Sequence, residues 1–467
     1  MSPSIALFIC LVGIAGLFYL DRNPSVRSSK ALWLPIIWLW IVGSRSVSEW
    51  LGIAPSGDMQ ADGSPVDAFV FQALLLAGIG VLVFRKRRAG AFLTANWTIL
   101  IYFAFCLVSV VWSDFAGIAF KRWIKSLGDL VMILVVLTDP EPSWALKRFL
   151  ARIGFVLMPL SIVLIRYFGN LGRAYTPDGV LMNTGVTTNK NTLGVITLVV
   201  GLGAIWRLVT LLFRERDEAD RGRHLLAQGA LVAFTVVVLG MSSSATSQAC
   251  FALGSTLIIA TQLRTFRTHP SAVHALVLTI LLGGVALMFF GGTAGLTQAL
   301  GRDSSFTGRT DIWAAVLSVV PNPLVGAGFE SFWMGPRLAQ VYSHLSEYMH
   351  VNEAHNGYIE VYLNLGWVGV VLIAVILLRG YSRAVAVFRS NSVMGSLLLA
   401  YVFSGAFRSI TEAGFRLLDP SWIFLLLAVV SAGAIAARQH GETLQLSEAA
   451  SDVQDWWYNV AAAKINH

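Results

Sequence analysis

Long apolar runs alternate with short polar segments from one end of the chain to the other. The runs are continuous and do not show the in-and-out alternation of barrel strands. Because a membrane span needs about 20 mostly apolar residues, the pattern predicts an all-α polytopic membrane protein with about 12–13 transmembrane helices. Two of the runs are short, and their flanks are expected to complete them. The predicted spans are 4–20, 31–43, 67–84, 95–111, 127–138, 152–165, 192–213, 225–241, 249–263, 273–291, 356–378, 391–407 and 418–437.

The composition supports this class of protein. Of the 467 residues, 56% are hydrophobic and 13% are charged, whereas a soluble domain carries about a quarter charged residues. This excludes a soluble enzyme, a nucleic-acid-binding protein and a disordered chain. Cys10, Cys106 and Cys250 all lie in apolar runs, so no disulfide framework or cysteine metal site is predicted.

Basic residues indicate how the chain is oriented. If the segment 21–30 is cytoplasmic, alternating loops place 22 of the 34 Lys and Arg residues on the cytoplasmic side, as the positive-inside rule expects. The N-terminus is then outside and the C-terminus inside. Residues 1–438 are predicted to form one membrane domain that contains a large periplasmic loop at 292–355. Residues 439–467 are predicted to be a cytoplasmic polar tail.

His355 begins the strongest local feature, His355-Asn356-Gly357, where the large loop meets a span. A helix N-terminus disfavours an imidazolium and can hold an anion such as a diphosphate. We therefore expect a neutral histidine that can remove a proton from a sugar hydroxyl. From the residue types alone, an interfacial histidine that caps a helix is the alternative. Gly366 and Gly369 are expected to serve close helix packing.

Arg309 and Trp313 lie in the same loop. An arginine can hold phosphate oxygens in a fixed fork. A tryptophan at i+4 can stack on a sugar ring or rest at the membrane interface. The alternative for Arg309 is a surface contact with Asp311.

Polar residues near other outer ends of spans are candidates for the same site. Asn191 is expected to be the N-cap of the span that starts at 192, and Lys190 can meet a phosphate there. Arg173 is a further candidate cation. Arg408 and Glu412 form an ionisable pair near the end of a span, which is a functional candidate unless the two residues only pair with each other.

No metal site is predicted. His344, His350 and His355 are six and five residues apart, and helical zinc sites use pairs four residues apart. No cofactor is predicted either.

Taken in order, these motifs resemble the O-antigen ligase / Wzy-type polysaccharide polymerase superfamily, and most closely its ExoQ-like exopolysaccharide polymerase branch. The resemblance covers roughly residues 110–425, and the combination is specific although each piece alone is not. It rests on the stretch that begins with His355-Asn356-Gly357, Gly308-Arg309 with Trp313, the stretch from Asn322 to Trp333, and Thr188-Asn189-Lys190-Asn191 with Gly194.

The resemblance implies a GT-C-like, metal-independent, inverting glycosyltransferase of the bacterial inner membrane, with its active site facing the periplasm. It implies a glycan on undecaprenyl diphosphate as donor, His355 as base on the acceptor hydroxyl and Arg309 as diphosphate ligand. Arg173, Lys190 and Arg408 are then supporting cations. Membrane lipid, a chain-length regulator and export proteins are expected partners, and nucleic acid is not.

The acceptor distinguishes the rival functions. Ligases of this superfamily typically carry an arginine in a Ser-rich stretch, but Ser242 to Thr246 contains none here. This favours a polymerase of lipid-linked repeat units over a ligase that uses lipid A-core. A transporter for the same lipid-linked sugar is the alternative from another class, and it predicts charged residues inside the spans.

Overall fold

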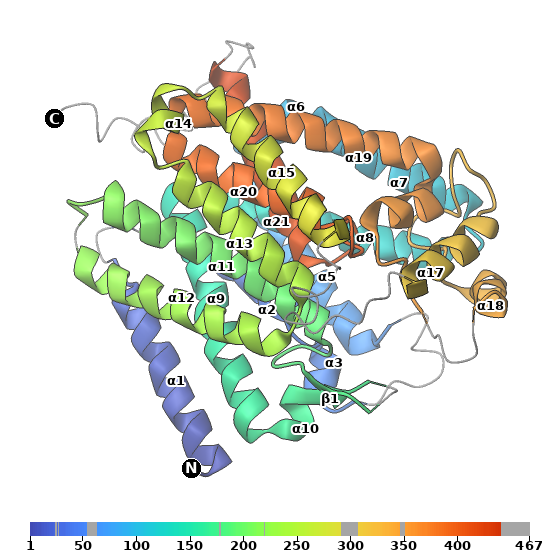
Figure 1. Ribbon diagram of the computed structural model, residues 1–467, viewed down its shortest axis with the longest axis horizontal. Coiled ribbons are helices and arrows are strands. Elements are labelled where there is room, and N and C mark those ends of the chain that lie inside the picture. Colours follow the sequence, from blue (N-terminus) through green and yellow to red (C-terminus); the bar gives the residue numbers. More distant parts are fainter. Residues whose placement is uncertain are drawn as a thin grey trace.

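The computed structural model is a bundle of helices with one short β-hairpin among the residues it describes (Figure 1). The hairpin pairs β1 (Arg173–Tyr175) with β2 (Leu181–Asn183) in antiparallel register. The tail 440–467 and the loop segments 291–306 and 346–350 lie outside the described residues. The structure describes residues 1–23, 26, 28–53, 63–176, 179–218, 220–290, 307–345 and 351–439, without the side chains of 287–290, 307–308 and 437–439.

A helix lies at each of the thirteen predicted runs, so the chain is an all-α polytopic membrane protein. Six helices are long and apolar enough to cross a membrane, and there are seven such spans if the bent pair α6–α7 is one span. The six are α1 (Pro3–Leu20), α5 (Pro65–Phe84), α9 (Pro142–Tyr167), α11 (Lys190–Phe213), α12 (Arg221–Ser242) and α19 (Gly357–Ser390).

The remaining predicted runs lie on the bent pair, on α8 and on shorter apolar helices. The bent pair turns by 87° at Asn96. The run at 127–138 is longer than predicted, because its amphipathic flank from Ala116 is also helical. These helices are α6 (Lys86–Ala95), α7 (Trp97–Ser109) with η2 (Val110–Trp112), α8 (Ala116–Leu137), η1 (Lys30–Leu32) with α2 (Trp33–Val42), α13 (Ala245–Ala260), α15 (Ala272–Phe290), α20 (Ser392–Arg408) and α21 (Pro420–Gln439).

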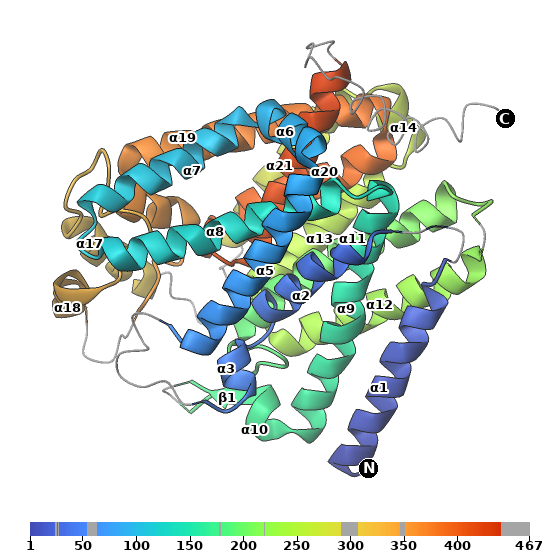
Figure 2. The same cartoon turned by 180° about the vertical axis from the view of Figure 1, so that it is seen from behind.

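Short helices connect the long ones, and two of them lie in the large loop beside the end of α19 (Figures 1 and 2). The two in the loop are α17 (Thr307–Ser318) and α18 (Gly335–Ser343). Their apolar residues form a second small core with Phe332 and Leu363. The others are α3 (Val47–Trp50), α10 (Gly169–Gly172) and α14 (Arg264–Thr268).

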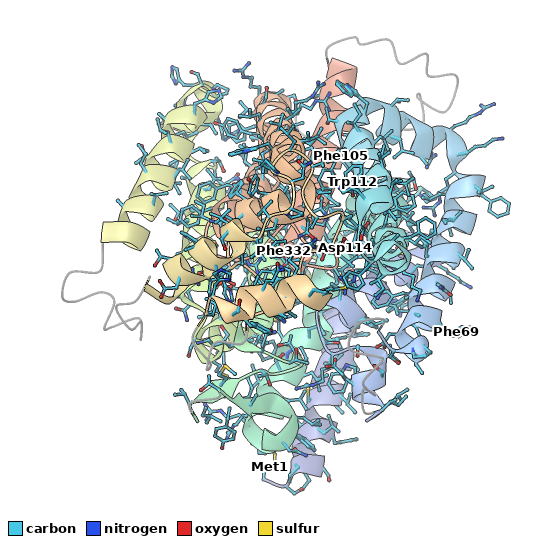
Figure 3. The ribbon with its side chains drawn as sticks, turned by 90° about the vertical axis from the view of Figure 1, so that its right-hand side faces the viewer. Met1, Phe69, Phe105, Trp112, Asp114 and Phe332 are labelled. Atoms are coloured by element: carbon cyan, nitrogen blue, oxygen red, sulfur yellow. The ribbon has the colours of Figure 1, made fainter. Side chains whose placement is uncertain are left out.

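Helix α11 runs through the centre of the bundle, whereas α1 lies at its edge and α5 lies on the face that Figure 2 turns toward the viewer (Figures 1 and 2). Of the apolar window of α11, 83% is buried, compared with 17% for α1. The peripheral helices expose large apolar side chains such as Phe69, which is 72% exposed and points outward in Figure 3. In a membrane, such faces meet lipid.

The two ends of α11 lie against different ionic clusters. At its C-terminal end, Arg207 contacts Glu215 and Glu218, and Lys147 lies 2.9 Å from Glu215. At its N-terminal end lies the cluster of His355. Asn191 and Arg207, the residues of α11 that contact the two clusters, are 16 residues apart, so the clusters lie about 24 Å apart along the helix.

Helix α19 is broken at Gly366, where φ is 62° and ψ is −164°. The loop before α18 fills the break. Ala327 N donates to Leu363 O on one side, and Trp367 N donates to Pro323 O on the other. A Cβ atom on Gly366 would lie 2.2 Å from the backbone of Leu324. The expectation of helix packing was therefore wrong for Gly366, which accommodates a loop backbone.

Candidate functional site

Glu412 is the centre of the candidate site. It lies in the loop between α20 and α21 and is 6% exposed. Its Oε1 lies 3.7 Å from an Arg309 guanidinium nitrogen, and its Oε2 lies 3.8 Å from His355 Nδ1. Asn191 Nδ2 donates to the same Oε2 at 3.4 Å. The fold thus brings together four of the residues that the sequence predicted, from α11, α17, the start of α19 and the loop before α21.

His355 lies directly before α19 with a left-handed backbone, at φ 49°. The next residue, Asn356, is the N-cap, and its side chain accepts from Tyr358 N and Ile359 N. The helix end is therefore already capped and does not decide the charge of the imidazole. His355 Nδ1 lies 3.0 Å from Glu353 Oε1 as well as near Glu412, in an orientation that forms an ion contact and not an aligned hydrogen bond.

These contacts correct the expectation of a neutral histidine at rest. Burial lowers the pKa of His355, but the carboxylates of Glu353 and Glu412 outweigh burial and raise the pKa to about 9. Two full negative charges prevail over the partial charge of a helix end. This arrangement therefore favours the protonated form of His355 at neutral pH.

Glu353 and Arg416 also belong to the site, although neither was among the predicted site residues. Arg416 lies 3.3 Å from Glu353 and 3.8 Å from Glu330. Burial raises the pKa of Glu353, but His355 and Arg416 outweigh this and lower it to about 2. Burial lowers the pKa of Arg416, whereas the surrounding carboxylates, Glu330 first, raise it above its ordinary value. Glu353 is thus a fixed carboxylate between two cations.

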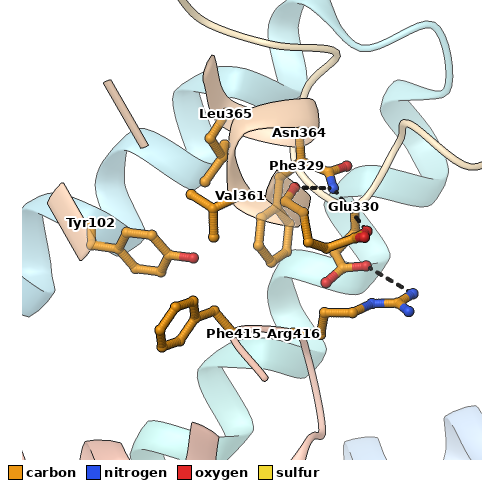
Figure 4. A pocket seen from close by; sticks show the side chains of 9 residues that line it. Tyr102, Phe329, Glu330, Val361, Asn364, Leu365, Phe415 and Arg416 are labelled. Atoms are coloured by element: carbon orange, nitrogen blue, oxygen red, sulfur yellow. Dashed lines mark hydrogen bonds and ion pairs between the residues drawn. The ribbon is translucent and has the colours of Figure 1, made fainter. Parts of the chain in front are cut away.

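A small cavity of about 10 Å³ lies beside this group (Figure 4). Such a volume has room for about one water molecule. Glu330 and Arg416 line it on one side, and Tyr102 and Phe415 line it on the other. The cavity is too small for a sugar, so the described residues do not enclose a substrate pocket here.

The N-terminus of α11 forms one wall of the site. The N-cap is Asn189, whose side chain accepts from Thr192 N at 2.8 Å. The prediction that Asn191 is the cap was therefore wrong, because the helix begins two residues earlier, at Lys190. Asn191 is free of the capping role, and its side chain reaches Glu412 instead. Lys190 is half-buried in this first turn.

Arg408 does not pair with Glu412 through its side chain. Its Nη1 lies 3.2 Å from Asp419 and 2.9 Å from the Ser421 hydroxyl, and the residue is 4% exposed. The predicted Arg408–Glu412 ion pair was wrong, because Asp419 at the start of α21 lies closer. Glu412 N donates to Arg408 O, and the Glu412 carboxylate acts on Arg408 only through its charge.

Two further predicted site residues have backbone partners. Arg173 lies in β1 and donates its Nε to Ile165 O at 2.8 Å, a contact that holds the hairpin on the end of α9. Trp313 is half-buried on α17, and its indole N–H donates to Ala354 O at 2.8 Å. Whether either residue binds substrate stays a prediction.

Glu353, His355 and Glu412 each offer one atom that could ligate a metal ion, all within 4.8 Å of one another. The other histidine of that loop within the described residues, His344, faces its own helix at Gln340 O. Both carboxylates also face guanidinium groups, those of Arg309 and Arg416. Two guanidinium groups thus already supply positive charge to the carboxylates that could ligate a metal ion.

Sequence spacing could not have revealed Glu353 and Arg416, because they belong to no motif. The one available signal was the position of Glu353, two residues before His355. Arg416 lies 61 residues after His355, and only the packing of the loop 411–419 against the start of α19 brings it near Glu353.

Comparison with known proteins agrees with these motifs. Residues 228–374 match the family model described as O-Antigen ligase, Wzy_C. This range contains Arg309, Glu353 and His355. The chain is also 24% identical, over 310 residues, to the exopolysaccharide production protein ExoQ of Rhizobium meliloti (strain 1021). The aligned residues make up 64% of this chain and 68% of ExoQ. The chain is thus similar to the O-antigen ligase family over residues 228–374 and to ExoQ over a longer stretch.

Proposed function

We propose that this protein is an inverting glycosyltransferase that polymerises oligosaccharide units carried on undecaprenyl diphosphate. The observation that carries the proposal is the joining of Arg309 and His355 through one buried carboxylate, Glu412. A cation for a diphosphate and a base for a hydroxyl are thereby held within one small site. The similarity to an O-antigen ligase family and to ExoQ supports a role in polysaccharide synthesis.

The diphosphate of the donor binds at Arg309 and the first turn of α11. An arginine fork suits phosphate oxygens, and a helix N-terminus favours an anion. Lys190 adds a second positive charge at that turn. The diphosphate then replaces Glu412 as the main partner of Arg309.

His355 acts on the acceptor hydroxyl. Nδ1 faces the two carboxylates, so Nε2 is the nitrogen that takes the proton. The acceptor oxygen forms a bond to the anomeric carbon while the bond from that carbon to the diphosphate oxygen breaks. The electron pair leaves with undecaprenyl diphosphate, and the anomeric configuration inverts. No metal ion takes part.

The site faces the periplasm of a bacterial inner membrane in this proposal. It lies at the end of α11 opposite the ionic cluster that contains Lys147 and Arg207. The positive-inside rule assigns such basic segments to the cytoplasm. Undecaprenyl-linked units meet the enzyme at the outer leaflet.

The growing chain is the donor, and the acceptor is a hydroxyl at the non-reducing end of a new lipid-linked unit and not lipid A-core. The Ser-rich stretch lies beside the site, since Thr246 Oγ1 is 3.1 Å from Thr411 Oγ1, next to Glu412. An arginine there, as ligases of the superfamily typically carry, would add a cation to the site, and this chain has none in Ser242 to Thr246. The family description as ligase keeps transfer to lipid A-core as the second candidate.

The test uses purified protein with an undecaprenyl-diphosphate-linked repeat unit as sole substrate. A ladder of longer glycans with released undecaprenyl diphosphate supports a polymerase. His355→Gln is expected to reduce the rate by roughly 10²–10⁴-fold, as for the loss of a general base. His344→Gln is the matched control, because His344 is exposed directly after α18.

Two other outcomes contradict the proposal. Transfer that needs added lipid A-core makes the protein a ligase. A ladder of wild-type yield from His355→Gln removes the histidine from the mechanism.

A further inference from the structure

Two hydrogen bonds, one buried and one partly buried, hold the backbone next to His355 from both sides. Glu360 Oε2 accepts from Ala354 N at 3.0 Å. Trp313 Nε1 donates to Ala354 O at 2.8 Å. Ala354 itself is fully buried. The first bond fixes the peptide group between Glu353 and Ala354, and the second fixes the one between Ala354 and His355.

This hold matters because the histidine conformation is uncommon. His355 has φ 49°, and non-glycine residues occupy this region only when their surroundings stabilise it. With both preceding peptide planes fixed, the left-handed turn carries the imidazole to Glu353 and Glu412. A relaxed backbone would carry it elsewhere.

Glu360 is itself held in place, in the first turns of α19. Its Oε1 accepts from Trp333 Nε1 at 2.6 Å, and Asn364 Nδ2 donates to its backbone oxygen at 3.0 Å. Asn364 Oδ1 in turn accepts from Ser331 N. The carboxylate therefore links two segments of the large loop, at Trp333 and at Ala354, to one helix.

Trp313 connects the histidine to the proposed diphosphate ligand. It lies four residues after Arg309 on α17, so the two side chains lie one helical turn apart on the same face. The Trp313–Ala354 bond fixes α17 against the segment that ends at His355.

We propose that Trp313 and Glu360 are positioning residues that fix the place of His355. They act through the two peptide groups that flank Ala354. Trp313 thereby sets the distance between the base and Arg309, in place of serving as a sugar platform. The reactive role of His355 in this inference rests on the proposed function, but the positioning can be measured without any substrate.

The first experiment measures the pH dependence of His355 labelling by diethyl pyrocarbonate, which acylates the neutral imidazole, with mass spectrometry of the purified protein. The midpoint reports how close the two carboxylates are. Trp313→Phe keeps a ring but removes the N–H donor and changes no charge, so a shift arises from geometry alone. We expect the midpoint to fall by at least about one pH unit toward the ordinary value of a histidine.

Trp206→Phe is the matched control. Trp206 also donates its indole N–H to a backbone oxygen, that of Val393 at 2.7 Å, and is buried, but it lies on the far part of α11. It is expected to leave the His355 midpoint unchanged. Glu360→Gln, which leaves only one acceptor oxygen for two donors, is expected to shift the midpoint as Trp313→Phe does.

The second experiment measures transfer kinetics. Trp313→Phe is expected to lower kcat about tenfold with little change in KM. If Trp313 instead stacked on a sugar, Trp313→Phe would keep its activity and Trp313→Leu would raise KM. An unchanged midpoint and kcat in Trp313→Phe overturns the inference. A midpoint that depends on Trp313 in a protein that transfers no glycan overturns the proposed function and leaves the positioning role in place.

Discussion

His355 Nδ1 lies 3.0 Å from Oε1 of Glu353, the residue two positions before it. The pair has the short distance, without the aligned hydrogen bond, of the carboxylate–histidine arrangement that orients a general base. Arg416 holds the carboxylate from its other side at 3.3 Å. Glu353 therefore orients the imidazole and strengthens it as a base. The same carboxylate favours the protonated form at neutral pH.

The first prediction concerns the pH dependence of transfer. Glu353 and Glu412 raise the pKa of His355 to about 9, and a base must be neutral to act. kcat/KM should therefore rise with pH up to about 9, by roughly 50-fold from pH 7 if only this group titrates. Initial rates across this pH range provide the measurement.

The same prediction has a variant that tests its cause. Glu353→Gln removes one carboxylate, so the midpoint of the profile should move to lower pH, whereas Glu353→Asp keeps the charge and serves as control. A rate that falls as pH rises through 9 would show that the imidazolium itself is needed, for example against the diphosphate, and would remove the base role.

The second prediction concerns metal ions. Glu353, His355 and Glu412 could hold an ion by geometry, but Arg309 and Arg416 already face the carboxylates. A divalent cation would have to approach these positive charges at close range. Transfer should remain within about twofold of its normal rate in excess EDTA. Loss of activity that Mg²⁺ or Mn²⁺ restores would make the cluster a metal site.

The apolar pattern was sufficient to predict the helices. Every predicted run lies on a helix, because membrane spans need continuous apolar sequence and the signal is local. The pattern could not predict the 87° bend between α6 and α7 or the break at Gly366. Both depend on which loop or helix packs there, which is a long-range property.

The candidate site was predictable only in part for the same reason. His355, Arg309, Asn191 and Glu412 meet as the motifs suggested. The partner of Arg408 was not predictable, since Asp419 competes with Glu412 for it and only the start of α21 decides the outcome. Residue types indicate which charges need partners, but the loop geometry selects the partner.

The third prediction concerns Arg408. Its buried pairing with Asp419 indicates a structural role, and removing one partner of such a pair costs roughly 3–5 kcal/mol. Arg408→Met should lower the thermal midpoint of the protein in detergent, measured by size-exclusion chromatography after heating. Arg408→Met combined with Asp419→Asn should recover part of the loss, because Asn can still cap α21 at Ser421 N.

A different result would show that Arg408 binds substrate. If Arg408→Met kept the thermal midpoint and raised KM for the lipid-linked donor, the residue would be a diphosphate ligand and the pairing with Asp419 incidental.

The fourth prediction concerns the break in α19. Gly366 has φ 62°, and an added Cβ would lie 2.2 Å from the carbonyl carbon and oxygen of Leu324. Neither backbone can move without losing the hydrogen bonds from Trp367 N and Val368 N to the loop. Gly366→Ala should therefore destabilise the protein by at least about 2 kcal/mol, through backbone strain and steric overlap together.

Gly229→Ala is the matched control for that variant. Gly229 lies inside α12, and a Cβ there would meet nothing within 4 Å, so alanine should be neutral or stabilise the helix by up to about 1 kcal/mol. Thermal midpoints of the two variants in the same detergent give the comparison. Equal midpoints would mean that the loop 323–328 does not occupy the break in the folded protein. A low midpoint for Gly366→Ala alone would establish that the large loop is built into α19, and that the segments carrying Glu330 and Trp333 depend on that junction.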